Sequence, residues 1–283
     1  MTFNLKAKKV KRLNQPLFTL LNTRPAHQAE ALSKAIQSHY GQVIVCPTIE
    51  IQWCSLEGTV IDLSSGTDKI IFISANAVQG FLNSAFYEAY LKAQKESCVS
   101  IELYAIGRAT QQYGLAHQLP LIVLSETAFD SESLLAHSVM QSVNQQSILI
   151  VKGQGGRSLL EETLASRGAK IQFLEVYDRV PAPFCASNWQ KFRTASTPVL
   201  LITSVESAQN LLKSLSQFDF DYASLNHPKW SFLVATVVFS ERIKAFMLAQ
   251  GWSRPIWVVA SQSNAGIIET LKKVNLGKEN VKK

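Results

Sequence analysis

Residues 71–82 read IFISANAVQGFL, a short apolar run followed by a serine and by apolar residues at helical spacing. Residues 200–212 read LLITSVESAQNLL and repeat this arrangement with one extra residue. Each copy predicts a buried strand, a serine and an amphipathic helix with a glutamine near its middle. The repeat favours two related α/β domains over one long sheet, although any two strand–helix units share this general pattern.

The same alternation extends in both directions from these two copies. We expect strands at 17–22, 43–46, 69–73, 103–106, 147–151, 171–176, 199–202, 232–238 and 256–259. We expect helices at 25–40, from 75, from 108, at 157–167, from 204, at 240–250 and at 264–273, several of them ended by a glycine. Strands that alternate with helices and are rich in β-branched residues are typical of parallel sheets covered on both faces. The fold class is therefore α/β.

Two segments read as strand without a following helix, at 46–53 and 171–180, with prolines in or after them. We interpret them as two crossings between the domains. The first domain is then discontinuous, residues 16–45 and 181–275, and the second, residues 54–170, is inserted into it. Residues 1–15 and 276–283 are expected to be basic, flexible tails.

The charge of the chain is concentrated at its ends. The chain has 28 basic and 21 acidic residues. Ten of the basic residues and one of the acidic residues lie in 1–15 and 272–283, so the rest of the chain has a net charge of −2. A nucleic-acid-binding domain usually carries its basic residues on the folded surface, so we expect no nucleic acid partner. No apolar run approaches the ~18 residues that span a bilayer, and no secretory signal is visible, so we expect no membrane partner and a cytoplasmic location. Nothing marks a subunit interface, and a monomer is the default expectation.

Cysteines and histidines show no pattern for a metal or a disulfide framework. The four cysteines are far apart, and Cys46 and Cys98 read as small core residues. The five histidines lack the spacing of zinc ligands.

Ligands of open α/β sheets bind at the carboxyl ends of the strands, where loops lead into helices. Hydroxyl, glycine, amide and cationic residues occupy these positions here: Thr23, Arg24, Ser74, Asn76, Arg108, Thr110, Lys152, Gly153, Arg157, Thr203, Ser204, Ser240 and Arg242. Ordinary helix capping explains each Ser or Thr. It does not explain the cations, because the helix dipole disfavours positive charge at a helix start. An anionic ligand would offset that cost.

The string KGQGGR at 152–157 lacks the spacing of a P-loop and of GxGxxG. We interpret it as an anion-binding turn, and we expect no nucleotide and no other cofactor. Tyr177 and Arg179 close the second crossing segment and are two residues apart, so they are expected on one face. A tyrosine hydroxyl there could donate a proton, and aromatic packing between the domains explains the residue equally well.

The order and spacing of several motifs resemble the uroporphyrinogen-III synthase family. They are TRP at 23–25 with QAEAL at 28–32, ISANAV at 73–78, IGRAT at 106–110, KGQGGR, EVYDRV at 175–180, ITS at 202–204 and GWxxxI at 251–256. The resemblance runs from Leu20 to Leu271. It implies two parallel-sheet α/β domains joined by a two-stranded β linker, with the active site in the cleft between them.

The resemblance also implies a reaction. Members of this family are lyases that cyclise hydroxymethylbilane, a linear tetrapyrrole with eight carboxylates, to uroporphyrinogen III on the route to haem. They remove water, invert ring D and need no cofactor. The resemblance implies that Tyr177 is the general acid and that Thr110, Thr203 and Ser204 bind substrate. Two departures are Lys152 where many members have arginine, and Ser240-Glu241-Arg242 where many have Gly-Pro-Thr-Thr.

Two other functions fit parts of the pattern. A non-catalytic, hinged two-domain module that binds an anionic small molecule would also place cations at the strand ends. Tyr177 argues against it, since a pure binder needs no proton donor. A nucleotide-dependent transferase would need the phosphate-binding motifs that this sequence lacks.

Overall fold

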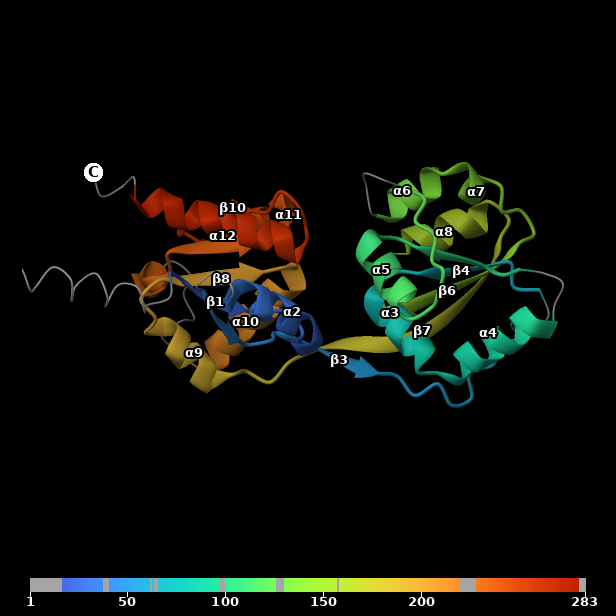
Figure 1. Ribbon diagram of the computed structural model, residues 1–283, viewed down its shortest axis with the longest axis horizontal. Helices are drawn as coiled ribbons and strands as arrows, with labels where there is room; N and C mark the ends of the chain where they lie inside the picture. The colour runs from blue at the N-terminus through green and yellow to red at the C-terminus, as the bar shows by residue number, and fades with distance from the viewer. Residues whose placement is uncertain are drawn as a thin grey trace, which may run out of the picture. The chain divides into compact units, whose positions relative to one another are not determined.

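The computed structural model describes residues 17–37, 41–61, 63, 66–96, 100–125, 130–156, 158–218 and 228–279. These residues fall into two compact units (Figure 1). Unit 1 takes the described residues of Met1–Glu50 and Val180–Lys283, and unit 2 those of Ile51–Arg179. The segment expected as an inserted domain, 54–170, lies within unit 2. None of the helices described is long and apolar enough to cross a membrane.

Unit 1 is built on a parallel five-stranded sheet in the order β10-β9-β8-β1-β2. Its strands are β1 (Thr19–Asn22), β2 (Gln42–Val45), β8 (Pro198–Ile202), β9 (Ala235–Val238) and β10 (Ile256–Val258). Every residue of β1, β8 and β9 is buried. Both faces of these strands are covered, which explains why they read as continuous apolar runs.

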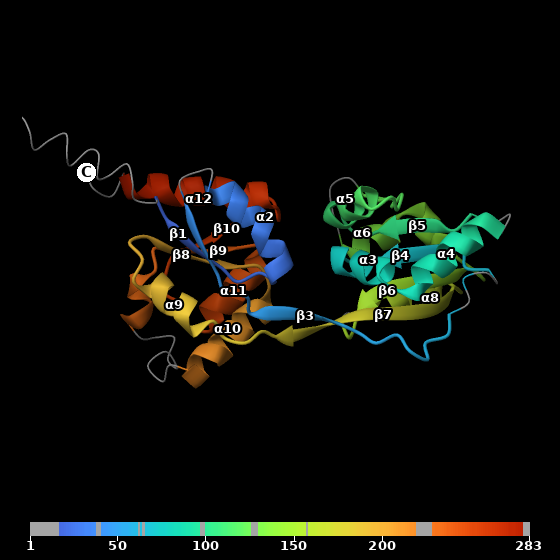
Figure 2. The same ribbon diagram turned by 60° about the horizontal axis from the view of Figure 1, so that its bottom comes forward.

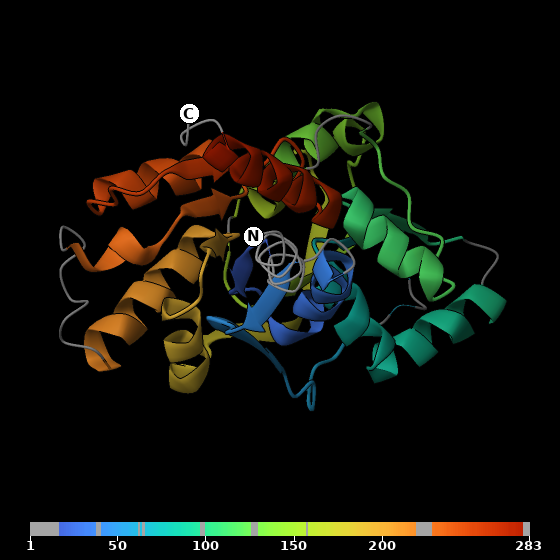
Figure 3. The same ribbon diagram turned by 60° about the vertical axis from the view of Figure 1, so that its left-hand side comes forward.

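Helices cover both faces of the first sheet (Figures 2 and 3). One face packs against α2 (Ala26–Gln37) and α12 (Asn264–Glu279), which supply Leu32, Ile36, Ile267 and Leu271 to the core. The other face is covered by α9 (Ala186–Arg193), α10 (Val205–Phe218), α11 (Glu241–Ala249) and the 3₁₀ helix η2 (Pro228–Phe232). Trp189, Trp230 and Trp252 pack together on this second face.

Unit 2 contains a second five-stranded sheet in the order β3-β7-β6-β4-β5. Its strands are β3 (Ile49–Trp53), β4 (Lys69–Phe72), β5 (Glu102–Ala105), β6 (Ser147–Gly153) and β7 (Lys170–Pro181). The pairs β4–β5, β4–β6 and β6–β7 are parallel. β3 and β7 extend over the segments expected as crossings, and each contains one boundary between the two units.

The second sheet is also covered on both faces. Phe81, Tyr90 and Ala93 of α3 (Ala75–Leu82) and α4 (Ala85–Glu96) pack on one face, and α5 (Arg108–Ala116) lies next to α3. On the other face, α6 (Ser131–Ala136), α7 (Ser138–Gln141) and α8 (Leu159–Ser166) pack on Ile71 and Tyr104. Each unit therefore has three layers and its own hydrophobic core.

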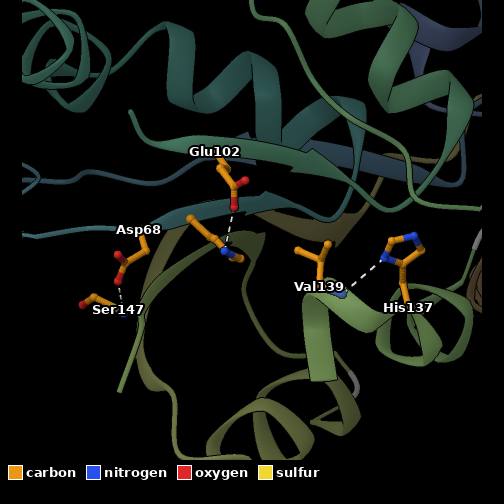
Figure 4. Close-up of polar contacts among 6 residues, drawn as sticks. Asp68, Glu102, His137, Val139 and Ser147 are labelled. Atoms are coloured by element: carbon orange, nitrogen blue, oxygen red, sulfur yellow. Dashed lines mark hydrogen bonds and ion pairs between the residues drawn. The ribbon is translucent and has the colours of Figure 1, made fainter. Parts of the chain in front are cut away.

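Polar contacts tie together the amino ends of the strands in unit 2 (Figure 4). Asp68 accepts a hydrogen bond of 2.7 Å from the backbone N–H of Ser147, at the start of β6. The buried Lys69 pairs with Glu102 at 2.6 Å, joining β4 to β5. His137 caps α7 by accepting a bond of 3.4 Å from Val139 N–H. The Asp68 hydrogen bond and the Lys69–Glu102 ion pair thus hold the amino ends of β4, β5 and β6, opposite to the carboxyl ends that lead to the predicted site residues.

The structure corrects several predicted boundaries. The strand expected at 147–151 continues to Gly153, because β7 pairs with it through Lys152 and Gly153. Phe232, expected in a strand, lies in η2. α12 continues to Glu279, so 276–279 are helical rather than part of a tail. The pattern also missed α4, α6, α7 and α9. Residues 1–15, 38–40 and 280–283, Cys98 and Arg157 lie outside the described residues.

The sequence repeat does not mark equivalent positions in the two sheets. The strand of the first copy is β4, which lies second from the β5 edge, whereas the strand of the second copy is β8, the middle strand. In each sheet, four strands have the same relation between their order in space and their order along the chain. They are β5-β4-β6-β7 in unit 2 and β2-β1-β8-β9 in unit 1. By that order β4 corresponds to β1 rather than to β8.

Candidate active site

Each sheet has one point where the direction of strand addition reverses, which is where ligands of such folds bind. In unit 1 this point lies between β1 and β8, and in unit 2 it lies between β4 and β6. The first pair of strands leads to Thr23, Arg24, Thr203 and Ser204. The second pair leads to Ser74 and ends at Lys152 and Gly153. The sequence therefore places its candidate residues next to both switch points, one group in each unit.

Three of the candidate serines cap helices, as the ordinary explanation predicted. Ser74 Oγ accepts from Ala77 N–H at 3.1 Å, Ser204 Oγ from Ser207 N–H at 2.9 Å and Ser240 Oγ from Ile243 N–H at 3.4 Å. A capping serine accepts with its oxygen and still has its own hydroxyl proton to donate. Capping and ligand binding are therefore compatible at these positions.

Thr23 takes part in a buried network of unit 1. Its hydroxyl donates to the carbonyl oxygen of Leu201 at 2.6 Å and lies 3.1 Å from Ser207 Oγ. Thr48 Oγ1 lies 2.7 Å from the same Ser207 oxygen. Since all three side chains are buried, the Thr23 hydroxyl serves the fold of unit 1 rather than an open site.

Tyr177 has a buried ring and a hydroxyl that contacts Ser74. The residue is 2% exposed, and its ring packs in the core of unit 2 and meets Trp53 edge-on at 6.5 Å. Its hydroxyl lies 3.1 Å from Ser74 Oγ, and either oxygen can donate. The phenol hydroxyl therefore contacts the residue that caps α3, next to the switch point of the second sheet.

A β-bulge gives Tyr177 this orientation. The pairing of β6 with β7 shifts register so that Lys152 faces Glu175 and Gly153 faces Tyr177, with Val176 left over. Val176 and Tyr177 are both buried, and the register shift at this point is a β-bulge. Arg179, two residues later, is exposed.

Gly153 leaves the space that the Tyr177 ring fills. A Cβ atom at this position would lie 2.6 Å from two atoms of the ring. The absence of a side chain at Gly153 therefore allows the Tyr177 ring to take its place, and the expected contact of Gly153 with substrate stays a prediction. Nothing in the local sequence reveals the contact with the ring, because it joins two strands through a bulge.

The candidate cations differ in their partners. Lys152, near the end of β6, lies 3.5 Å from Glu161 and over the ring of Phe173 at 5.2 Å. Arg108, Arg179 and Arg242 are exposed. Lys152 therefore carries a charge that an acid of the same unit already balances, and the expected anion-binding turn begins with a paired cation.

Arg24 has no such acid among the described residues. Its Nη1 donates to Asn264 Oδ1 at 2.7 Å, its Nη2 to Gln28 Oε1 at 3.4 Å, and its guanidinium lies 6.0 Å from the centre of the Phe239 ring. Its Nε is buried without a hydrogen-bond partner in the same part of the chain. Burial lowers the pKa of Arg24 from its usual value, because removing a cation from water disfavours its charged form. The sequence pointed to Arg24 but not to Gln28, Asn264 or Phe239.

Asn76 and Thr110 lie in the first turns of α3 and α5, and both are buried. A pocket of about 270 Å³ at the carboxyl ends of β4, β5 and β6 does not include them and is lined by Asp130, Glu132, Glu161 and Lys152 together with other residues. Among the described residues that line this pocket, acids outnumber the one cation, which disfavours a carboxylate there.

Cysteines and metal ligands add no chemistry to the described site. Cys46 is buried, as expected, and no group of three His, Cys, Asp or Glu side chains in the described part of the chain could hold a metal ion. The polar groups described next to the two switch points are hydroxyls, the phenol of Tyr177, the ammonium of Lys152 and the guanidinium of Arg24.

Comparison with known proteins gives a consistent result. The family model described as uroporphyrinogen-III synthase HemD matches residues 30–269. The uroporphyrinogen-III synthase of Salmonella typhimurium is 28% identical over 270 residues, which cover 90% of this chain and 100% of that protein. The one from Proteus mirabilis is 30% identical over 206 residues, 69% of this chain and 98% of that protein.

The fold is similar to that of a solved structure. Uroporphyrinogen-III synthetase from Helicobacter pylori 26695 matches with a TM-score of 0.58 over 91% of this chain and 99% of that one. The sequence identity is 14%, so this likeness concerns the architecture of two α/β units.

Proposed function

This chain belongs to the uroporphyrinogen-III synthase family, and from that premise we propose how its residues carry out the reaction. The activity is that of a uroporphyrinogen-III synthase, a hydro-lyase of tetrapyrrole biosynthesis. The substrate that the family implies is hydroxymethylbilane. The roles of individual residues are the part that we propose.

The first step needs a proton donor, and Tyr177 is our candidate. The phenol would give its proton to the hydroxymethyl oxygen as the carbon–oxygen bond breaks and water leaves. The pyrrole nitrogen would supply the electrons, leaving an azafulvene cation. Ser74 supports this role, because a hydroxyl 3.1 Å from the phenol oxygen can donate to it while the phenolate carries charge. This single contact is the observation on which the proposal rests.

The second requirement is to hold a flexible chain of four pyrroles in one conformation. Closure without assistance gives the isomer with ring D uninverted, so positioning decides the product. We propose that the eight carboxylates are held by Arg24, by the hydroxyl protons of Ser204 and Ser240, and by N–H groups at the starts of α10 and α11. Helix N-termini suit anions because their N–H groups are unpaired and the dipole is positive there.

We also propose that the protein acts as a cytoplasmic monomer without a cofactor. Size-exclusion chromatography with light scattering tests the monomer directly. A dimer at micromolar concentration would reject it.

The test of the function is a coupled assay. Hydroxymethylbilane is generated in situ, the purified protein is added, and the oxidised products are separated into type I and type III uroporphyrin. We expect a protein-dependent change from type I to type III. If a folded protein leaves type I unchanged, the synthase function is rejected and an anion-binding module becomes the working hypothesis.

The roles of Tyr177 and Ser74 are tested in the same assay. Tyr177→Phe keeps the ring in the core, so we expect normal folding and a kcat lower by roughly 10²- to 10⁴-fold, the range for one acid–base group. Ser74→Ala should lower kcat by less, and Ser74→Thr, which keeps the hydroxyl, should restore most of it. Wild-type turnover in Tyr177→Phe would remove Tyr177 as the acid.

A further inference from the structure

Arg24 is a partly buried cation whose visible partners are all neutral. Its two hydrogen-bond acceptors in the described residues are the side-chain amides of Asn264 and Gln28, and no carboxylate there forms an ion pair with it. The buried Lys69 and the half-buried Lys152, by contrast, each pair with a glutamate. Removing a cation from water is costly unless an anion or strong hydrogen bonds offset it. The surroundings of Arg24 leave this cost only partly offset.

Two buried donors beside Arg24 have no acceptor among the described residues. Arg24 Nε is one, and the second is Nδ2 of Asn22, the fully buried last residue of β1. Asn22 also holds the backbone of Arg24, because its Oδ1 accepts from Arg24 N–H at 3.2 Å. Most buried polar groups in proteins are hydrogen-bonded, so the described residues leave part of the hydrogen-bonding capacity around Arg24 unused.

Asn264 belongs to a turn of fixed shape. It is the first residue of α12, and Ser263 caps this helix by accepting from Gly266 N–H at 3.1 Å. A Cβ atom at Gly266 would lie 2.1 Å from the carbonyl oxygen of Ser261, so only glycine allows this approach. The turn therefore holds the Asn264 amide in place at the positive end of a helix of 16 residues.

From this geometry we propose that Asn264 is a positioning residue that orients Arg24 without neutralising it, and that the guanidinium of Arg24 receives one carboxylate of the substrate. An aspartate in place of Asn264 would orient Arg24 equally well but would also balance its charge. The neutral amide is thus the specific requirement. The proposal rests on the function proposed above, because it identifies the ligand as a carboxylate of a polycarboxylate tetrapyrrole.

The decisive variant is Asn264→Asp, compared with two controls. Gln262→Glu adds the same charge two residues earlier in the same turn, where the side chain is exposed. Asn264→Ala removes the contact without adding a charge. Binding is measured with uroporphyrin I, an oxidised macrocycle that carries eight carboxylates, by fluorescence titration, so that the readout does not depend on turnover.

We expect Asn264→Asp to weaken uroporphyrin binding roughly tenfold to a hundredfold, as for the loss of one charge-assisted hydrogen bond. Its KM for hydroxymethylbilane should rise similarly while kcat changes little. Gln262→Glu should bind within about threefold of wild type, and Asn264→Ala should lie between the two. The Tm of Asn264→Asp should equal or exceed that of wild type, because the introduced carboxylate forms an ion pair with Arg24.

The inference fails if Asn264→Asp binds as tightly as Gln262→Glu, or if Arg24→Gln binds uroporphyrin like the wild-type protein. A lower Tm of Asn264→Asp with unchanged uroporphyrin binding would show that Asn264 has only a structural role, and this result would also reject the inference. Failure of the proposed function looks different. In that case the wild-type protein yields no type III product, while Asn264→Asp still weakens uroporphyrin binding relative to Gln262→Glu.

Discussion

Cys46 connects the burial of one side chain to the stability of unit 1 at alkaline pH. Burial, with the neighbouring Cys185 as a smaller cause, raises the pKa of its thiol from 9.0 to about 12. The folded state therefore holds this proton more tightly than the unfolded chain does. The stabilisation is complete below about pH 9 and is lost as the pH rises toward 12. We expect the free energy of unfolding in urea to fall over this range.

The matched variant for this prediction is Cys46→Ala, which removes the titrating group. Its free energy of unfolding at pH 8 will differ from that of wild type because the side chain is buried. The quantity to compare is therefore the slope of the free energy of unfolding against pH in the two proteins. A shallower slope in Cys46→Ala supports the assignment. Equal slopes in the two proteins would mean that other groups cause the alkaline loss.

Single residues also show the limit of prediction from sequence. The capping of helices by Ser74, Ser204 and Ser240 is local, and the sequence predicts it correctly. The contact of Arg24 with Asn264 spans 240 residues, and that of Ser74 with Tyr177 spans 103. No local pattern reveals such pairs. The sequence therefore identifies candidate residues at strand ends, but it does not show which of them contact other side chains of the protein.

At the scale of elements, the bulge between β6 and β7 makes a testable link between strand pairing and the proposed acid. Gly153→Ala places a methyl group 2.6 Å from the Tyr177 ring, on a strand that cannot easily move. We expect a loss of about 1–3 kcal/mol in the free energy of unfolding, as for an overpacked core. Turnover should fall as well, because the phenol moves away from Ser74.

The double variant provides the control. In a Tyr177→Leu background the clash is relieved, and alanine is favoured over glycine in a strand by roughly 0.5–1 kcal/mol. Gly153→Ala should then be neutral or stabilising, a change of sign measurable by urea unfolding. A loss of the same size in both backgrounds would show that the cost arises from the strand itself and not from the ring.

Two glycines of unit 2 lie inside a strand and a helix because of tertiary contacts. β6 continues through Lys152 and Gly153, two residues that usually end a strand, because β7 supplies pairing partners there. Gly80 interrupts the pattern of α3, yet a Cβ at that position would lie 2.6 Å from Val176, so the glycine allows the helix to approach the bulge. Tertiary contacts decide both cases, and propensity alone could not.

For the whole molecule, the alternation of strands and helices was sufficient to predict an α/β fold with parallel sheets. Fold class depends on periodicity summed over many residues, and errors of a few residues at each boundary do not change it. The order of strands is different, because it depends on which strands pair. The repeat between 71–82 and 200–212 illustrates this point, since its two strands occupy different places in their sheets.

The division into two units leads to a prediction about folding. Unit 2 is one continuous stretch with two core clusters of its own, one on each face of its sheet. A fragment of residues 49–181 keeps β3 and β7 whole, and with them every strand of that sheet. We expect this fragment to unfold cooperatively in urea, and Gly153→Ala to destabilise it by the same amount as the full chain. A fragment without a cooperative transition would mean that the core of unit 2 is insufficient alone. A cooperative fragment in which Gly153→Ala has no effect would instead mean that the Tyr177 ring takes its buried position only in the full chain.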